Sequence, residues 1–488
     1  MELRDVLIGF ADWQGYGHGD RAAAWLQRLE VNRPEIEAFR AAPTPSCAVY
    51  VPRATRVEPA DGVAANESRL PADAAEALVR VRRHADLNAF TWLPDAVAPA
   101  GRGLLAGVPV AVKDLMEVSG MPLTGGSKAL GRAPATRDAE IVARLKRAGA
   151  VVVGLTNLHE LAYGVTSDNP HFGRVVNPVA PSRIPGGSSG GSAAAIAAGI
   201  VRLAIGTDTG GSIRIPAACC GIVGFKPSYD ALPRDGVLDL AHSLDHVGPM
   251  GRTVEDCAAM FAALLELPAI PPWSRRNLHG ATVARLGGYF AAPLDGEVRA
   301  AMDAAMQALA ADGARCVARD VEGMDLAAAI MLNTIAPEAS AFHADRVKER
   351  GQDFGEDVRV RVETGFFFPV HWYLKAQRMR TRLVASIESA FGDADMLICP
   401  TMRATAPQVG ASRVDIEGKS FALHTSVTNL TVPFNLSGLP AASIPWTASR
   451  DGAPIALQIV GRRGHDWRVL AFARRLELAS PWHARQPR

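Results

Sequence analysis

Two glycine- and serine-rich stretches on either side of one apolar segment constrain this chain more than any other feature. The first spans residues 184–192 and reads IPGGSSGGS, and the second spans residues 206–216 and reads GTDTGGSIRIP. Between them an alanine-rich run predicts a helix, and residues 201–205 predict a short buried strand. Glycine lets backbone N–H groups point toward a ligand, and serine supplies hydroxyl groups that can act as nucleophiles. The pattern therefore indicates a site built from backbone donors and hydroxyl groups.

Parts of these stretches also fit motifs of other enzymes. Residues 186–190 match the G-x-S-x-G nucleophile elbow, which would make Ser188 the nucleophile of an α/β-hydrolase, but nothing marks the acid and the histidine that must follow. Residues 208–210 resemble an aspartic-protease motif, but no second copy completes a pair of aspartates. Neither stretch contains the G-x-x-x-x-G-K-S/T pattern of a phosphate-binding loop. The chemistry therefore has to be judged from both stretches together.

The paired loops resemble the signature of the amidase signature family, the Ser-cisSer-Lys amidohydrolases, which includes stand-alone bacterial amidases. The family has a third element upstream, a lysine that ends an apolar strand, and residues 105–114, LAGVPVAVKD, supply it with Lys113. The spacings from Lys113 to Ser188 and from Ser188 to Ser212 are both in keeping with the family. Three linked motifs in this order are far more specific than one glycine-rich loop, and the resemblance covers residues 75–476.

The resemblance implies hydrolysis through a serine acyl-enzyme. Ser212 is the implied nucleophile, Lys113 the base, and Ser188, after a cis peptide bond with Gly187, the relay that carries the proton between them. The apolar strand before Lys113 predicts burial, which lowers the pKa of a lysine and keeps it neutral. None of the twelve histidines lies in these motifs, so a Ser-His-Asp triad is not supported. A catalytically silent protein of the same fold is an alternative, and the three intact residues weigh against it.

The second stretch also carries the residues that the resemblance assigns to the oxyanion. Backbone N–H groups that converge on a developing negative charge often provide the largest single contribution to acyl transfer. The implied oxyanion-hole donors are the N–H groups of Thr209, Gly210, Gly211 and Ser212. Asp208 and Arg214 are interpreted as structural residues that hold this loop through an ion pair or hydrogen bonds.

The substrate is inferred from the segments that line the pocket in the family. Tyr163, Gly164 and Val165 are candidate substrate-binding residues, together with Thr428. The aromatic residues in 366–373 are candidate walls for an apolar substrate, or part of the core. The implied substrate is a small neutral carboxylic amide, or a related anilide or urea-type compound, which is hydrolysed to an acid plus ammonia or an amine.

The A subunit of a tRNA-dependent amidotransferase is the main alternative, because it resembles this chain but takes glutamine as its substrate. In that protein a Glu-Ala-Ser segment leads into a Tyr-Asp-Gly-x-Arg-Tyr-Gly stretch, whose arginine binds the glutamine carboxylate. Here residues 338–340 read EAS, but the stretch that should follow is missing. Arg346 is a possible substitute for that arginine, but the residues around it do not match the motif. An aspartate before a Thr-Val-Pro-x-Asn motif holds the glutamine ammonium there, and Thr428 takes that position before residues 431–435, TVPFN. Glutamine is therefore expected to bind poorly, because unpaired charges in a closed pocket are costly.

The order of the predicted elements indicates an α/β fold. Helical periodicity, a glycine and an apolar strand follow one another at residues 141–153 and again at 298–317, and Thr253 with Asp256 predicts a capped helix start. The resemblance implies one large mixed, twisted sheet between layers of helices. We expect a helical and loop extension over residues 1–75 and the catalytic domain over residues 76–488.

Composition narrows the possible partners. The chain has a net charge of +2, which does not indicate a nucleic-acid partner, and its six cysteines show no C-x-x-C spacing that would hold zinc. Residues 1–5 lack the features of a signal peptide, and arginine and glycines interrupt the apolar stretch 190–207, so no membrane span is expected. The sequence predicts a cytoplasmic enzyme for a small amide that uses no metal or cofactor, and a homodimer is left open.

Overall fold

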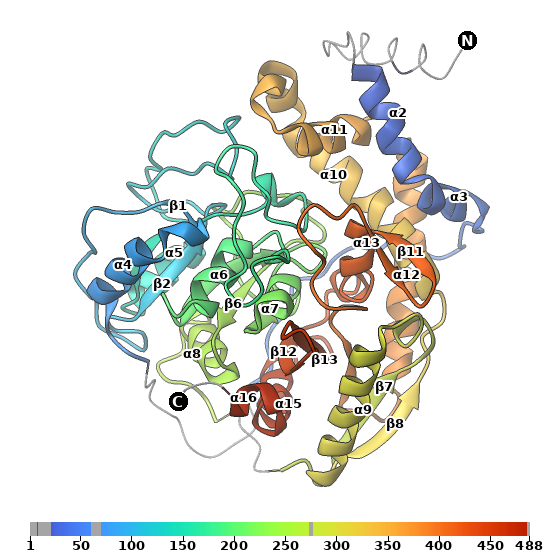
Figure 1. Cartoon of the computed structure of the whole chain (residues 1–488). Helices are drawn as coiled ribbons and strands as arrows, with labels where there is room; N and C mark the ends of the chain where they lie inside the picture. The colour runs from blue at the N-terminus through green and yellow to red at the C-terminus, as the bar shows by residue number, and fades with distance from the viewer. Residues whose placement is uncertain (1–6, 8–20, 60–69, 273–276, 486–488) are drawn as a thin grey trace.

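An 11-stranded sheet of mixed strand directions runs through the centre of the molecule (Figure 1). The structure is a computed structural model that describes residues 7, 21–59, 70–272 and 277–485. The strands are β1 Phe90–Trp92, β2 Pro109–Lys113, β3 Val151–Thr156, β4 Leu203–Asp208, β5 Val223–Lys226, β6 His246–Gly251, β7 Thr282–Leu286, β8 Arg315–Arg319, β9 Met396–Pro400, β12 Ala441–Ala448 and β13 Pro454–Val460, with a separate hairpin of β10 Arg413–Ile416 and β11 Lys419–Ala422. Their order across the sheet is β1-β3-β2-β4-β6-β5-β12-β13-β9-β7-β8. The predicted α/β fold with a large mixed sheet is confirmed.

Lys113 is the last residue of β2, which lies in the buried interior of this sheet. β2 pairs in parallel with β3 on one side and with β4 on the other. Every residue of the three strands is buried, which is why they read as continuous apolar runs. The strand predicted over residues 201–205 begins two residues later and extends to Asp208, because its last residues pair with β6. This extension brings Thr207 and Asp208 to the end of a strand beside β2.

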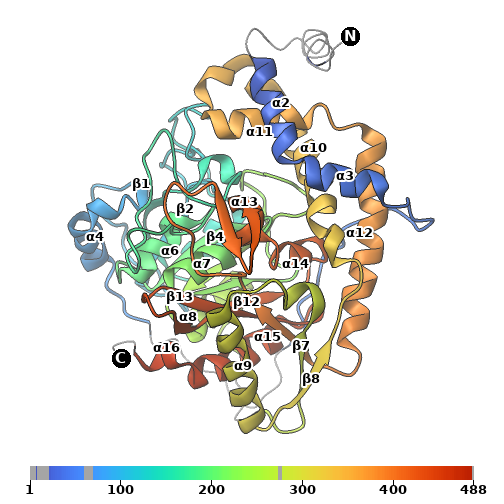
Figure 2. The same cartoon turned by 45° about the vertical axis from the view of Figure 1, so that its right-hand side comes forward.

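Helices cover both faces of the sheet (Figures 1 and 2). Val110 and Val112 contribute to the core beneath one helical layer, whereas Ala111 between them contributes to the core on the other face, as the alternation of a strand requires. The first layer contains α5 Glu140–Arg147, α8 Val254–Leu264, α9 Gly296–Ala311 and α15 Asp466–Ala479. The second contains α4 Ala74–Arg83, α6 Gly190–Ala197, α7 Arg214–Cys220, α10 Ala327–Arg350, α12 Val370–Phe391 and α14 Val432–Leu436. Two further short helices are α13 Leu423–Thr428 and α16 Pro481–Ala484.

The glycines and the capping residues that the sequence predicted at helix ends lie at helix ends in the structure. α5 is followed by Gly149 at a φ of +88°, a conformation that favours glycine, and β3 begins directly afterwards. The same arrangement recurs at Gly313, between α9 and β8. The side chain of Thr253 accepts a hydrogen bond from the Asp256 N–H, and the Asp256 carboxylate accepts one in return, which completes the predicted capping box of α8.

Two N-terminal helices, α2 Arg21–Val31 and α3 Arg33–Ala41, lie against α10 and against α11 Glu356–Gly365 (Figure 2). The rings of Trp25 and Phe367 are 5.3 Å apart, and those of Phe39 and Trp372 are 5.9 Å apart. Phe367 and Trp372, two of the aromatic residues that were candidate pocket walls, therefore pack against these two helices. Residues 1–6, 8–20 and 60–69, which include the stretch examined for a signal peptide, lie outside the described residues.

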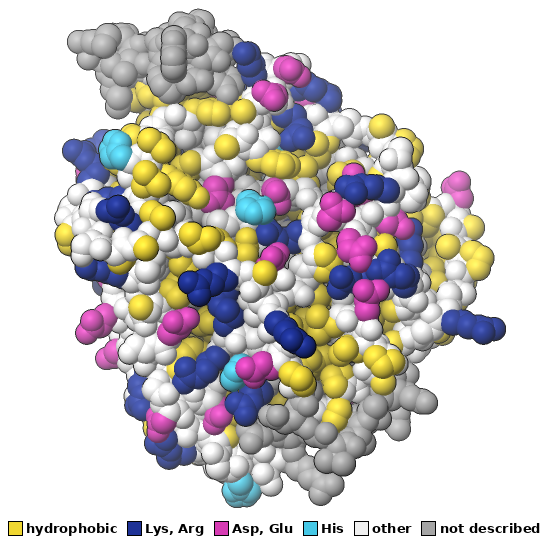
Figure 3. Space-filling model, turned by 180° about the vertical axis from the view of Figure 1, so that it is seen from behind, with side chains coloured by type: hydrophobic (Ala, Val, Ile, Leu, Met, Phe, Trp, Pro, Cys, Tyr) yellow, Lys and Arg dark blue, Asp and Glu magenta, His cyan; other side chains and the backbone are white. Residues whose placement is uncertain are grey.

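The surface mixes both signs of charge. On the face seen in Figure 3, basic and acidic side chains are interspersed with apolar ones, and neither sign forms a separate patch on the described part of that face. Some of the exposed charges are paired, as Arg315 is with Asp393. Within the described residues, no helix has the length and the apolar character needed to span a bilayer.

Candidate active site

Lys113 lies completely buried at the point where the two glycine-rich loops meet the sheet. Its Nζ donates hydrogen bonds to Ser188 Oγ over 2.7 Å and to Thr207 Oγ1 over 2.8 Å. Burial lowers the pKa of Lys113 to about 7, although the carboxylates of Asp208 and Asp245 act in the opposite direction. The amine can therefore exist in its neutral, basic form near neutral pH.

The first loop presents Ser188 to this lysine. The Gly187–Ser188 peptide bond is cis, as the resemblance implied. The hydroxyl of Ser167 donates to the carbonyl of Gly186 over 2.8 Å, and the N–H of His159 donates to the carbonyl of Ser188 over 3.1 Å. The Ser188 side chain is fully buried, so its position is set by the loop and not by solvent.

Ser212 lies on the second loop and faces a pocket. The N–H of Ser189 donates to the carbonyl of Ser212 over 3.3 Å, which joins the two loops. The structure records no hydrogen bond between the hydroxyls of Ser188 and Ser212. Within the described part of the chain, the Ser212 hydroxyl has no hydrogen-bond partner. Ser212 is only 6% exposed and lines the pocket. Its hydroxyl is thus free to meet a ligand that enters there.

The backbone of the second loop differs from the expectation at one of its four positions. The N–H of Gly211 donates to Asp208 Oδ1 over 2.8 Å, so it is not free to bind an oxyanion. The physical reason is the turn that the Asp208 carboxylate imposes, because it also accepts the N–H groups of Ile213 and Arg214. Gly211 itself does not line the pocket, whereas the other three predicted donor residues do. These three residues are Thr209, Gly210 and Ser212, and their N–H groups have no acceptor within the described residues.

Gly211 has a different role in this loop. Its φ is +130°, a region that disfavours residues with a side chain, and a Cβ added there would collide with the Thr431 hydroxyl. That hydroxyl donates to the carbonyl of Gly210 over 2.6 Å. The close approach of Thr431 holds the peptide that follows Gly210, so a glycine is required at this position.

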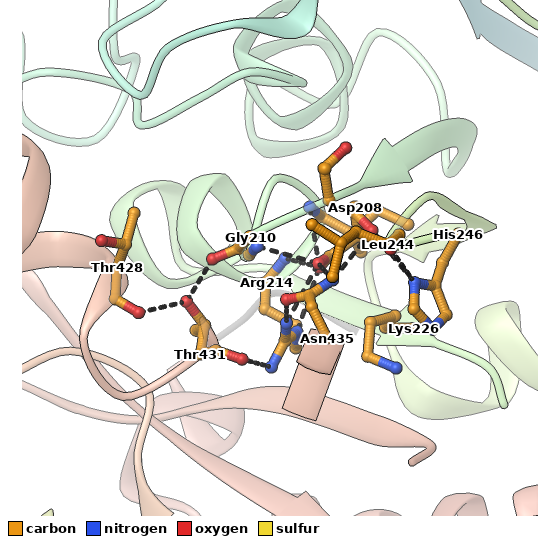
Figure 4. Close-up of polar contacts among 12 residues, drawn as sticks. Asp208, Gly210, Arg214, Lys226, Leu244, His246, Thr428, Thr431 and Asn435 are labelled. Carbon is orange, nitrogen blue, oxygen red and sulfur yellow. Dashed lines mark hydrogen bonds and ion pairs between the residues drawn. The ribbon is translucent and has the colours of Figure 1, made fainter. Parts of the chain in front are cut away.

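Asp208 and Arg214 form a fully buried ion pair behind the loop (Figure 4). Arg214 Nη2 and Asp208 Oδ1 are 3.0 Å apart, and Arg214 Nη2 also donates to Asn435 Oδ1 over 2.7 Å. Burial alone would raise the pKa of Asp208, but Arg214 outweighs it and holds the pKa well below its usual range. The pair ties the loop to Asn435, from the TVPFN segment of α14, and to Gln458 of β13.

The pocket in front of Ser212 has an empty volume of about 790 Å³, part of it open to solvent. The four candidate substrate-binding residues, Tyr163, Gly164, Val165 and Thr428, are uncharged and all lie on the pocket wall. The wall also carries the polar side chains of Arg28, Asn32, Glu35, Arg361 and His424. Sequence reasoning missed these five residues because no local motif marks them and three of them come from α2, α3 and the turn between these helices.

Most of the residues compared with the glutamine site lie outside this pocket. Arg346 Nη1 is 2.8 Å from His343 Nδ1, and its guanidinium lies over the Phe342 ring, so Arg346 is not among the residues that line the pocket. Glu338 accepts hydrogen bonds from Ser243 and from the Tyr373 hydroxyl. Of the positions considered for glutamine, the pocket wall contains only Thr428. No group of three or more His, Cys, Asp or Glu side chains within the described ranges is arranged to hold a metal ion.

Comparisons with known proteins cover most of the chain. The family described as Amidase matches residues 74–470. The chain is 35% identical to the A subunit of the glutamyl-tRNA(Gln) amidotransferase of Ralstonia nicotianae, over 84% of this chain and 94% of that protein. It is 38% identical to AtzE, a subunit of the 1-carboxybiuret hydrolase of Pseudomonas sp. strain ADP, over 73% of this chain and 80% of that protein. A solved structure of an amidase has a TM-score of 0.78 and 34% identity, and the match covers 84% of this chain and 96% of that one.

Fold, site and relatives together define an enzyme that acts on carbon–nitrogen bonds of amides. The chain belongs to the amidase signature family. Its relatives include both a component of a glutamyl-tRNA(Gln) amidotransferase and a component of a 1-carboxybiuret hydrolase, so the family alone does not select the substrate.

Proposed function

We propose that this chain is a stand-alone amidase that cleaves small carboxylic amides, including anilide- and urea-type compounds, through a Ser212 acyl-enzyme. The observation that carries the proposal is the 2.7 Å hydrogen bond between the buried amine of Lys113 and Ser188, together with Ser212, which lines the pocket and whose hydroxyl has no hydrogen-bond partner among the described residues. An amide is a poor electrophile, so its hydrolysis needs an activated nucleophile. A neutral buried lysine supplies the base that this nucleophile lacks.

The proposed steps use the three side chains in turn. As Ser212 Oγ bonds to the amide carbon, its proton passes to Ser188, and Ser188 passes its own proton to Lys113. The contact between the two serine hydroxyls forms when substrate orders the site, as hydrogen bonds of resting enzymes often tighten on binding. The protonated Lys113 returns the proton through Ser188 to the leaving nitrogen when the carbon–nitrogen bond breaks. Water then attacks the acyl ester by the same relay and releases the acid and free Ser212.

The oxyanion of each tetrahedral intermediate is assigned to the free N–H groups of the second loop. The donors are those of Thr209, Gly210 and Ser212, because the Gly211 N–H is held by Asp208. Such donors, fixed before the reaction, lower the barrier without reorganising during it. The uncharged candidate binding residues Tyr163, Gly164, Val165 and Thr428 suit a neutral amide group at the scissile bond.

Two observations favour this function over that of a glutamine-using component of an amidotransferase. Thr428 offers no carboxylate for the glutamine ammonium, and Arg346 packs outside the pocket. We expect the purified chain to release ammonia from alkyl and aryl primary amides without any partner protein, and to hydrolyse glutamine poorly. Parallel assays of ammonia release from a panel of alkyl, aryl and urea-type amides and from glutamine test this. Efficient glutamine hydrolysis, or activity only with partner proteins and tRNA, would overturn the proposal.

The activity of this enzyme is expected to fall on the acidic side of neutrality. Lys113 acts as a base only when it is neutral, and its pKa is about 7 because it is buried. Lowering the pH through 7 protonates the amine, so kcat/KM should drop about tenfold for each further pH unit. The measurement is a pH profile of kcat/KM with a neutral amide, whose own charge does not change in this range. A profile that stays flat well below pH 6 would remove Lys113 from the role of base.

A further inference from the structure

Two arginines lie on the wall of the pocket that Ser212 also lines. Arg28 comes from α2 and Arg361 from α11. The Arg361 guanidinium is paired with Asp357, with Nη2 2.9 Å from Oδ1, and it lies over the Tyr163 ring, 5.6 Å from its centroid. Arg28 is different, because none of the described residues forms an ion pair or a side-chain hydrogen bond with its guanidinium.

The charges around Arg28 offset one another only in part. Burial, and then the nearby positive charge of Arg361, lower the pKa of Arg28 to about 10, whereas the carboxylates of Asp357 and Glu35 act in the opposite direction. Arg28 therefore remains protonated at neutral pH. His424 lines the same wall, and burial together with the two arginines lowers its pKa to about 3, so it is a neutral imidazole. Glu35 is the acidic residue on this wall. Burial raises its pKa, whereas the charge of Arg28 acts in the opposite direction, and one of its carboxylate oxygens has no hydrogen-bond partner among the described residues.

A guanidinium without an ion-pair partner among the described residues is costly in a partly closed pocket, and a bound anion offsets that cost. The planar fork of an arginine binds a carboxylate through two parallel hydrogen bonds, and neutral His424 can add another donor. A carboxylate fits better than a doubly charged phosphate, because Glu35 lies on the same wall. Arg28, Arg361 and Ser212 line the same pocket, so one elongated ligand can contact the two arginines and the serine together.

We propose that Arg28 and Arg361 form an anion subsite, and that the substrate is an amide with a carboxylate at the end remote from the scissile bond. The inference rests on the proposed amidase function and names its substrate class. It also gives a role to α2, because this N-terminal helix supplies the guanidinium that has no other partner within the described residues. Glutamine is expected to be a poorer substrate, since it adds an ammonium group and Thr428, the position considered for that group, offers no carboxylate.

The test compares two series of primary amides that differ only at the far end. One series consists of half-amides of dicarboxylic acids of increasing chain length, and the other ends in an alcohol at the same place. For the best chain length, kcat/KM from ammonia release should be roughly tenfold or more higher for the carboxylate, as expected for a charge-assisted pair. In Arg28→Gln, kcat/KM should fall about tenfold for the carboxylate and change less than about twofold for the alcohol.

Arg33→Gln is the matched control, because Arg33 is an exposed arginine of α3 that pairs with Glu30 outside the pocket. It should leave the preference for the carboxylate unchanged. Equal rates for both series in the unchanged enzyme, or an equal loss on both in Arg28→Gln, would overturn the subsite while leaving the amidase function intact. Hydrolysis of neither series would instead count against the amidase function. Calorimetric binding of the half-amides then decides on the subsite: binding that Arg28→Gln abolishes supports it, and no binding overturns it.

Discussion

Ser212→Ala is expected to lower kcat by on the order of 10⁴- to 10⁶-fold, which is the loss found when the nucleophile of a serine hydrolase is removed. The alanine variant keeps the oxyanion donors and the pocket but has no oxygen to form the acyl ester. The variant should remain folded, because the Ser212 hydroxyl holds no hydrogen bond within the described residues. Steady-state kinetics on the best amide of the panel, beside a thermal melt of each protein, measure both effects.

The neighbouring serines provide the comparison that makes this test specific. Ser188→Ala should lose about 10²- to 10⁴-fold, the range for general acid–base groups, because it interrupts the proton relay but keeps the nucleophile. Ser189→Ala should keep most of the activity, since its hydroxyl donates to the carbonyl of Thr207 and not to Lys113. A serine-directed phosphonate should label Ser212. An adduct mapped to Ser188, or near-normal turnover by Ser212→Ala, would contradict the assignment.

The parts of the site that could be predicted are those that short motifs contain. Lys113, Ser188 and Ser212 each lie in a segment whose residues determine the local backbone, and two of these segments surround one strand. The buried position of Lys113 also follows from the sequence, because an apolar run before a lysine predicts a strand inside a sheet. The structure agrees on both points: Lys113 ends a fully buried strand, and its amine meets Ser188.

The remainder of the site depends on packing between distant segments, which no local pattern records. Arg28 and Arg361 share a pocket only because α2 packs on α11, and the contact that holds them there includes the rings of Trp25 and Phe367. The same packing explains why the aromatic segment near Phe367 was open to two interpretations from its sequence. The Gly211 N–H was predicted to bind the oxyanion because the motif does not show which backbone groups the Asp208 carboxylate binds. In the structure this carboxylate accepts the Gly211 N–H.

Asp208→Asn is expected to destabilise the protein by about 3–5 kcal/mol, the usual cost of leaving one member of a buried ion pair without its partner. Both side chains of the Asp208–Arg214 pair are fully buried, so water cannot replace the lost carboxylate. The neutral amide would retain part of the hydrogen bonding but would leave the Arg214 charge uncompensated. Urea unfolding of the two proteins measures the difference, and the loop that carries Ser212 should lose its order first.

Asp393→Asn is the matched control for this substitution, because it removes the same carboxylate from an exposed pair with Arg315. Salt and solvent screen such a pair, so the unfolding midpoint should stay nearly unchanged. If Asp208→Asn shifted the midpoint as little as Asp393→Asn does, the buried pair would not be what stabilises the second loop. Its two polar neighbours, Asn435 and Gln458, would then have to hold Arg214 without the carboxylate. A large loss confined to Asp208→Asn instead ties the stability of the fold to the residue that shapes the oxyanion loop.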